Sequence, residues 1–201
     1  MTTRVRVSIL AMAVAVSAVL PAVAAAQSPV TIGVKGGVNV ATLKFDEDNE
    51  DVKSKVGAVA GLFLSKAIND KVGFRVEGLF SQKGAKDAES GEDAKLKLTY
   101  VDVPVLLTFG PASSSDTRFH FFTGPQFSFN TKAEFEDDGV TEDADTLIKG
   151  NDLGWVLGAG LEKGRITADA RYTLGLSNIF EQGDEGKNRV FSVMIGVKLN
   201  K

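Results

Sequence analysis

The chain contains no cysteine and a single histidine, His120. It therefore forms no disulfide and carries no lipid-modified N-terminal cysteine. One imidazole without a thiolate does not provide the ligands of a structural zinc site, which takes four cysteine or histidine ligands. The residue types favour His120 as a polar side chain of the interior or of a strand end rather than as a base or metal ligand. We expect no metal, no cofactor and no catalytic residue.

An excess of basic residues is also absent. The 23 lysines and arginines are outnumbered by 26 aspartates and glutamates, for a net charge of −3. Nucleic-acid binding needs a basic patch or stripe, so we expect no nucleic-acid partner. Long apolar runs are missing after the first 26 residues. Any later segment that crosses a membrane must therefore do so as strands, because only helices and closed barrels satisfy their backbone groups in lipid.

The one long apolar run lies at the N-terminus. Two arginines precede the apolar residues 7–20, and Pro21 and an alanine-rich stretch ending at Ala26 follow. A charged start, an apolar centre and a small-residue cleavage site are the pattern of a secretory signal peptide. The alternative, a transmembrane anchor, needs about 20 apolar residues. We predict a signal peptide at 1–26 and one domain at 27–201.

Alternation with a period of two dominates the rest of the chain. Residues 119–130 show it, since successive side chains of a strand point to opposite faces. The apolar face holds Phe119, Phe121, Phe127 and Phe129, and the polar face holds His120, Gln126, Ser128 and Asn130. Phe122 is the apolar exception on the polar face. The pattern predicts a strand with one oily and one polar side.

The same alternation predicts eight strands without an intervening helix. They span residues 30–41, 56–66, 72–83, 97–109, 119–130, 152–162, 166–177 and 190–200. Long, mostly acidic connections (44–55, 84–94, 131–151 and 180–188) alternate with shorter ones (67–71, 110–117 and 163–165). Short periplasmic turns and long extracellular loops are typical of transmembrane barrels. We predict an all-β fold, an eight-stranded antiparallel up-and-down transmembrane β-barrel.

The residues on each face indicate which side meets lipid. Glycines are common on the polar face, where a narrow barrel is crowded, and aromatic residues gather on the oily face as a girdle would. The girdle residues are Phe74, Phe80, Phe119, Phe129, Trp155 and Tyr172. A lysine or arginine at mid-bilayer costs roughly 2–4 kcal/mol, so the charges belong inside. The predicted lumen charge cluster, structural or gating, is Lys35, Arg75, Glu77, Asp102, Asp169 and Arg171.

Five motifs, in order along the chain, resemble the PorT-like outer-membrane β-barrel family. They are GVKGGVN at 33–39, YVDVPVL at 100–106, FTGPQF at 122–127, GAGLE at 158–162 and RYTLGLSN at 171–178. The resemblance implies an eight-stranded barrel in a bacterial outer membrane and does not imply a particular task. One departure is Lys201, where such barrels commonly end in an aromatic residue.

These observations favour a small, non-enzymatic outer-membrane barrel with a structural or interaction role and a lumen filled by side chains. Two alternatives remain open, a narrow channel for ions or small solutes and a secreted lipocalin-like carrier. An enzyme is a weaker possibility. The expected partners are outer-membrane lipid and lipopolysaccharide, the barrel insertion machinery, and a possible extracellular ligand.

Overall fold

The computed structural model describes residues 30–45, 52–87, 95–110, 117–137, 140–144, 147–180 and 186–200. The predicted signal peptide and most of the predicted acidic loops lie outside the described residues. Among the residues that the structure does describe, no helix has the length and apolar content needed to cross a membrane.

The described residues form nine antiparallel strands. They are β1 (Thr31–Phe45), β2 (Val52–Ala67), β3 (Val72–Asp87), β4 (Lys95–Phe109), β5 (Thr117–Asp137), β6 (Val140–Asp143), β7 (Asn151–Lys163), β8 (Ile166–Gly175) and β9 (Gly186–Lys198).

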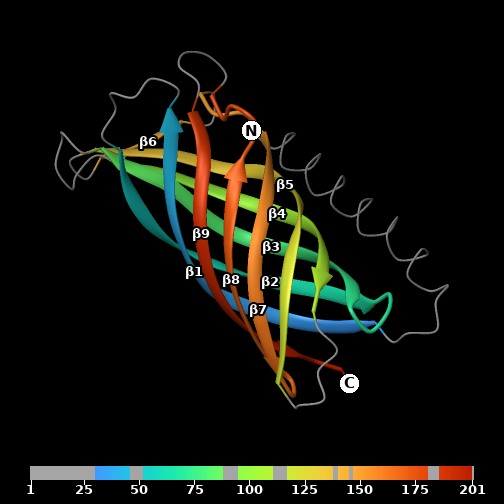
Figure 1. Ribbon diagram of the computed structural model, residues 1–201. Coiled ribbons are helices and arrows are strands. Elements are labelled where there is room, and N and C mark those ends of the chain that lie inside the picture. The colour runs from blue at the N-terminus through green and yellow to red at the C-terminus, as the bar shows by residue number, and fades with distance from the viewer. Residues whose placement is uncertain are drawn as a thin grey trace.

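Eight of these strands close into a barrel (Figure 1). Each pairs with its neighbour along the chain, β4 pairs with β5, β5 pairs with β7, and β1 pairs with β9 to complete the ring. The closing ladder is long, running from Gly33 opposite Lys198 to Phe45 opposite Gly186. Closure leaves the barrel wall without an open edge, which a sheet in lipid requires. The predicted fold class is confirmed.

The connections differ between the two ends of the barrel. Tight turns join β2 to β3 and β7 to β8, at the end where β9 finishes (Figure 1). Gly164 takes a positive φ of 57° in the second of these turns, a conformation that suits glycine. The longer connections lie at the other end. By the usual arrangement of such barrels, the tight turns face the periplasm and the long connections face outward.

The two faces of the wall separate as the alternation predicts. Phe119, Phe121 and Phe127 are exposed on the outer face, and His120 and Ser128 are buried inside. The six aromatic residues predicted for the girdle all lie on the outer face. Phe80, Phe119, Trp155 and Tyr172 are exposed there, and Phe74 and Phe129 are half-buried.

Strands extend beyond their predicted bounds at the long-loop end. The segment 131–151 was expected to be a loop, but β5 continues to Asp137 and pairs with β6, a short strand missed from the sequence. The extension stays paired with β4 as well, from Lys95 opposite Glu136 onward, and Lys97 forms an ion pair with Glu136 there. Cross-strand pairing of opposite charges supports this extension.

Candidate functional site: a charged network in the lumen

The structure places all six charged residues of the predicted cluster inside the barrel, each at most 5% exposed. Lys35 comes from β1, Arg75 and Glu77 from β3, Asp102 from β4, and Asp169 and Arg171 from β8. They lie inside because each has the same strand parity as its buried neighbours. Five of them form one connected network, and Asp102 belongs to a separate ion pair.

Glu77 is the first hub of the network. Lys35 Nζ donates to Glu77 Oε1 at 2.7 Å. Arg171 donates to both carboxylate oxygens, from Nη1 to Oε2 at 2.7 Å and from Nη2 to Oε1 at 3.1 Å. Two parallel bonds between a guanidinium and a carboxylate are among the strongest polar contacts in proteins. Glu77 therefore holds β1, β3 and β8 together across the lumen.

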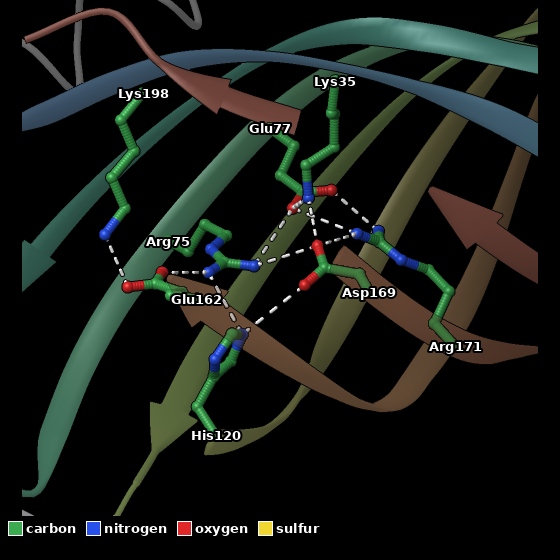
Figure 2. Close-up of polar contacts among 8 residues, drawn as sticks. All are labelled: Lys35, Arg75, Glu77, His120, Glu162, Asp169, Arg171 and Lys198. Carbon is green, nitrogen blue, oxygen red and sulfur yellow. Dashed lines mark hydrogen bonds and ion pairs between the residues drawn. The ribbon is translucent and has the colours of Figure 1, made fainter. Parts of the chain in front are cut away.

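Asp169 is the second hub, and three cations surround it. Lys35 Nζ lies 2.5 Å from Asp169 Oδ2, and Arg75 Nη1 lies 3.2 Å from the same oxygen. Arg171 Nη2 is 3.6 Å from it. Figure 2 shows Lys35 between the two carboxylates, joining the hubs. The centre of the network thus contains three cations and two anions. Each of these charges lies next to at least one charge of opposite sign.

An arm of the network extends toward the short-turn end. Arg75 Nη2 lies 3.3 Å from His120 Nε2 and 3.5 Å from Glu162 Oε1. Glu162 also accepts a bond of 2.5 Å from Lys198 Nζ on β9 (Figure 2). His120 is 3.5 Å from Asp169 Oδ1. His120 is thus a buried member of the polar network, in line with the interior position expected for it.

Two phenylalanine rings pack against the network from within. Lys35 and Arg75 lie over the Phe63 ring at 5.1 and 5.5 Å, and Arg75 and Arg171 lie over the Phe122 ring at 5.7 and 5.3 Å. Cations at these distances are attracted to the ring face, more strongly where water is excluded. Phe122, the apolar exception of its strand, therefore belongs in the lumen.

Glycines on neighbouring strands make room for these rings. A Cβ at Gly33 would lie 2.2 Å from the Phe63 ring, and one at Gly158 would lie 2.4 Å from the Phe122 ring. No side chain fits at either position without displacing a buried ring. Gly33 and Gly158 are therefore required by the packing of the two rings in the lumen.

A second ion pair lies nearer the long-loop end. Lys83 Nζ donates to Asp102 Oδ1 at 2.8 Å and to Ser128 Oγ at 3.3 Å, and it lies 4.4 Å from the centre of the Tyr100 ring. An interior cavity adjoins this pair, with a volume of about 10 Å³. A water molecule needs roughly 10–15 Å³ measured in this way, so the cavity holds one water at most.

An apolar cluster closes the lumen above the second pair. Strand residues supply part of it, and residues between the strands cover it from the long-loop end. The members are Leu43, Ala85, Leu98, Tyr100, Ala133, Ala144, Ile148 and Ile179. Ala144, Ile148 and Ile179 come from the connections after β6 and β8. The interior is consequently polar in the middle and sealed by apolar side chains at the outward end.

Sequence reasoning missed several members of the interior. Lys83 has the same parity as Ser81, but it stands at the predicted end of its strand, so it was not assigned to the lumen. Glu162 and Lys198 have the inward parity of their strands, but parity does not identify a partner across the lumen. The inward positions of Phe63 and of the apolar cluster could not be recognised in the sequence. An apolar side chain inside the barrel looks there like an interruption of the alternation.

The charged side chains of the network bind one another rather than lining an open site. In the part of the chain that the structure describes, no group of three histidine, aspartate or glutamate side chains is placed to hold a metal ion. The buried donors and acceptors of the network face one another across distances of 2.5–3.9 Å. The network thus fills the middle of the barrel with charged side chains that pair with one another.

Comparison with known proteins agrees with this architecture. The family described as "Outer membrane protein beta-barrel domain" matches residues 25–181. No curated protein matches the chain. Among solved structures, the Neisserial surface protein A is similar at a TM-score of 0.55 and 16% identity, covering 85% of this chain and 99% of its own. The outer membrane protein OprG from Pseudomonas aeruginosa is similar at 0.50 and 12% identity, covering 87% and 98%. At such identities the likeness extends to the fold alone.

Proposed function

Given that the chain belongs to the outer membrane protein beta-barrel domain family, and so lies in the bacterial outer membrane, we propose that it is a non-conducting, non-enzymatic barrel. Its task, on this proposal, is performed by the loops that it holds outside the cell. The barrel itself is a rigid support in contact with outer-membrane lipid and lipopolysaccharide, placed there by the barrel insertion machinery. A soluble, lipocalin-like carrier is not compatible with a location in the outer membrane.

The filled lumen is the observation that carries the proposal. The ion-pair network spans the interior between β1, β3 and β8, the Phe63 and Phe122 rings pack against it, and the apolar cluster closes the outward end. The interior of an eight-stranded barrel is just wide enough for side chains to fill. The cavity beside the Lys83–Asp102 pair, of about 10 Å³, has room for one water at most, which supports a lumen that does not conduct.

Acidic loops support the interaction role. By sequence, five of the six residues 46–51 are acidic, and residues 134–145 add seven more carboxylates. They adjoin strands that end on the outward side of the barrel. An acidic rim of this kind favours cationic ligands, or divalent cations that bridge to lipopolysaccharide phosphates. Within the family, the five motifs favour the PorT-like group as the nearest subfamily.

Planar-bilayer recording of the purified full-length mature protein tests the proposal. We expect no large, stable conductance steps, and a leak no greater than that of bilayers treated with detergent alone. The single variant Glu77→Gln removes a hub anion and serves as the comparison, since it loosens the network without shortening a strand. Stable open channels in the wild-type protein contradict the proposal.

A narrow channel is the second candidate, and one observation favours it. Charged groups occur along the interior from Lys198 to Asp102, between buried apolar side chains. If the protein conducts ions, neutralising Arg75 or Arg171 should abolish or reshape that conductance. An enzyme is the least supported candidate, because His120 is held by Arg75 and Asp169 within the network. His120→Ala should therefore leave every property outside stability unchanged.

A further inference from the structure

A groove is cut into the outer, lipid-facing wall of the barrel, outside the interior network. It lies over β4, β5 and β7 and is lined mainly by Phe109, Phe121, Thr123, Leu157 and Ala159. Its volume of about 460 Å³ falls within the roughly 300–1,000 Å³ of typical ligand sites. The lining is almost wholly apolar, so the groove fits a hydrocarbon chain better than a polar group.

The groove arises where small residues stand among large ones. Ala159 lies opposite Phe121 on one side and opposite Ala170 on the other. The floor is therefore low, while the Phe121 ring, which is 65% exposed, and Leu157 rise beside it. One wall is also fixed in place, because Trp155 Nε1 donates to Thr123 Oγ1 at 2.9 Å. The groove is therefore a hollow with one wall held by a hydrogen bond.

Cationic side chains stand at the short-turn end of the same strands. Lys163 has the same parity as Leu157 and Ala159 on β7, so it faces outward, and it is exposed. Arg165 is exposed in the turn that follows. Four residues separate Ala159 from Lys163, which is about 13 Å at ~3.3 Å per residue. Lys163 thus lies on the same outward face as the groove, toward the short-turn end.

We propose that this surface is a binding site for one anionic phospholipid of the periplasmic leaflet. Its acyl chain lies in the groove over Phe121 and Ala159, and its phosphate pairs with Lys163 and Arg165. Charge complementarity selects the headgroup, since each basic residue near a lipid surface attracts anionic lipid by about 1 kcal/mol, or about fivefold. The cations stand at the short-turn end, which faces the periplasm, so the phospholipid belongs to the periplasmic leaflet. Lipopolysaccharide occupies the opposite leaflet.

Native mass spectrometry of the full mature barrel, refolded in detergent, tests the site. The protein is titrated with phosphatidylglycerol and, separately, with phosphatidylcholine of the same acyl chains. We expect one phosphatidylglycerol to be retained per barrel, with weaker retention of phosphatidylcholine. The double variant K163Q/R165Q should weaken phosphatidylglycerol binding by roughly 30-fold and leave phosphatidylcholine unchanged. Ala159→Phe fills the groove and should weaken both lipids.

Matched controls separate the site from general adhesion of lipid. Lys71→Gln removes an exposed cation from the other described tight turn, and Ala60→Phe enlarges an outward alanine on β2. Both should bind lipid as the wild type does, and gel heat-modifiability should show that every variant folds. Equal losses in Lys71→Gln and K163Q/R165Q overturn the proposal, as does full lipid retention by Ala159→Phe. If the wild type retains no lipid and instead forms a dimer that Ala159→Phe dissociates, the groove is a contact with a second copy. That result also overturns the proposal.

Discussion

Glu77→Gln is the sharpest perturbation of the interior network. The substitution keeps the size of the side chain and one hydrogen-bond acceptor, and it removes one negative charge. Glu77 is 2% exposed and binds Lys35 and Arg171. Without it, Asp169 is the single anion left among Lys35, Arg75 and Arg171. Lys35 and Arg171 then share that one carboxylate with Arg75, which keeps Glu162 as a second partner.

The expected cost is large for a conservative change. Removing one partner of a buried ion pair typically destabilises a protein by about 3–5 kcal/mol, since the remaining charge stays buried and unpaired. That is a substantial part of a typical free energy of unfolding of roughly 5–15 kcal/mol. With a guanidinium dependence of roughly 4 kcal/mol per M, the unfolding midpoint should fall by about 1 M.

Equilibrium unfolding in guanidinium chloride, with the barrel in lipid vesicles, measures this change. Trp155 is the only tryptophan and faces lipid, so its fluorescence reports loss of the barrel. Gel heat-modifiability provides a second probe of the same transition. The matched control is Glu136→Gln, which removes a carboxylate of the same kind from the solvated Lys97–Glu136 pair at the end of the barrel.

The control should shift the midpoint much less, because exposed ion pairs contribute little. The reasoning is refuted if Glu77→Gln and Glu136→Gln shift the midpoint by the same small amount. A double-variant cycle with Arg171→Met adds a second check. The pair E77Q/R171M should be less destabilised than the sum of the two single variants, since contacting residues couple.

Three further predictions follow from the packing, the orientation and the rim. Gly33→Ala should lower the free energy of unfolding by about 1–3 kcal/mol, because its Cβ overlaps the Phe63 ring. Gly36→Ala, whose Cβ has 3.6 Å to its nearest neighbour, should have little effect in the same denaturation assay. Brominated lipids should quench Trp155 fluorescence strongly, whereas an inward-facing indole would stay bright. The hydrogen bond from Lys97 holds the pKa of Glu136 below its ordinary 4.5, so that pair stabilises the fold above pH 4.5 and loses its contribution as the pH falls through the lowered pKa. NMR titration should show the pKa of Glu136 rising toward 4.5 in Lys97→Gln.

The wall of the barrel was predictable from sequence because lipid imposes a strict alternation on every strand. A single misplaced arginine in lipid costs enough to fix the register, so the inward positions of Lys35, Arg75 and Arg171 follow from parity alone. The strands beyond the bilayer were not predictable in the same way. All of β6 is exposed, and residues 134–143 are rich in carboxylates, so their sequence looks like that of an acidic loop.

The contacts between side chains inside the lumen could not be predicted from the alternation. Alternation shows that a side chain points inward, but it does not show which strand it meets across the barrel. Lys35 and Asp169 are 134 residues apart in sequence and 2.5 Å apart in the structure. The apolar members, Phe63 and Phe122, ran against the expectation of a polar interior. Their role depends on the cations packed over them, which only the assembled barrel reveals.

The order in which the interior can assemble follows from the chain positions of its hubs. Lys35 lies on the first strand, Glu77 on the third and Asp169 on the eighth, and the ring closes where β1 meets β9. Until that seam forms, the hubs cannot all be in reach of one another, and their charges remain hydrated. Water therefore leaves the lumen in the same late step in which β1 pairs with β9. Lys35→Met should leave early insertion unaltered and change only the final slow phase of barrel formation.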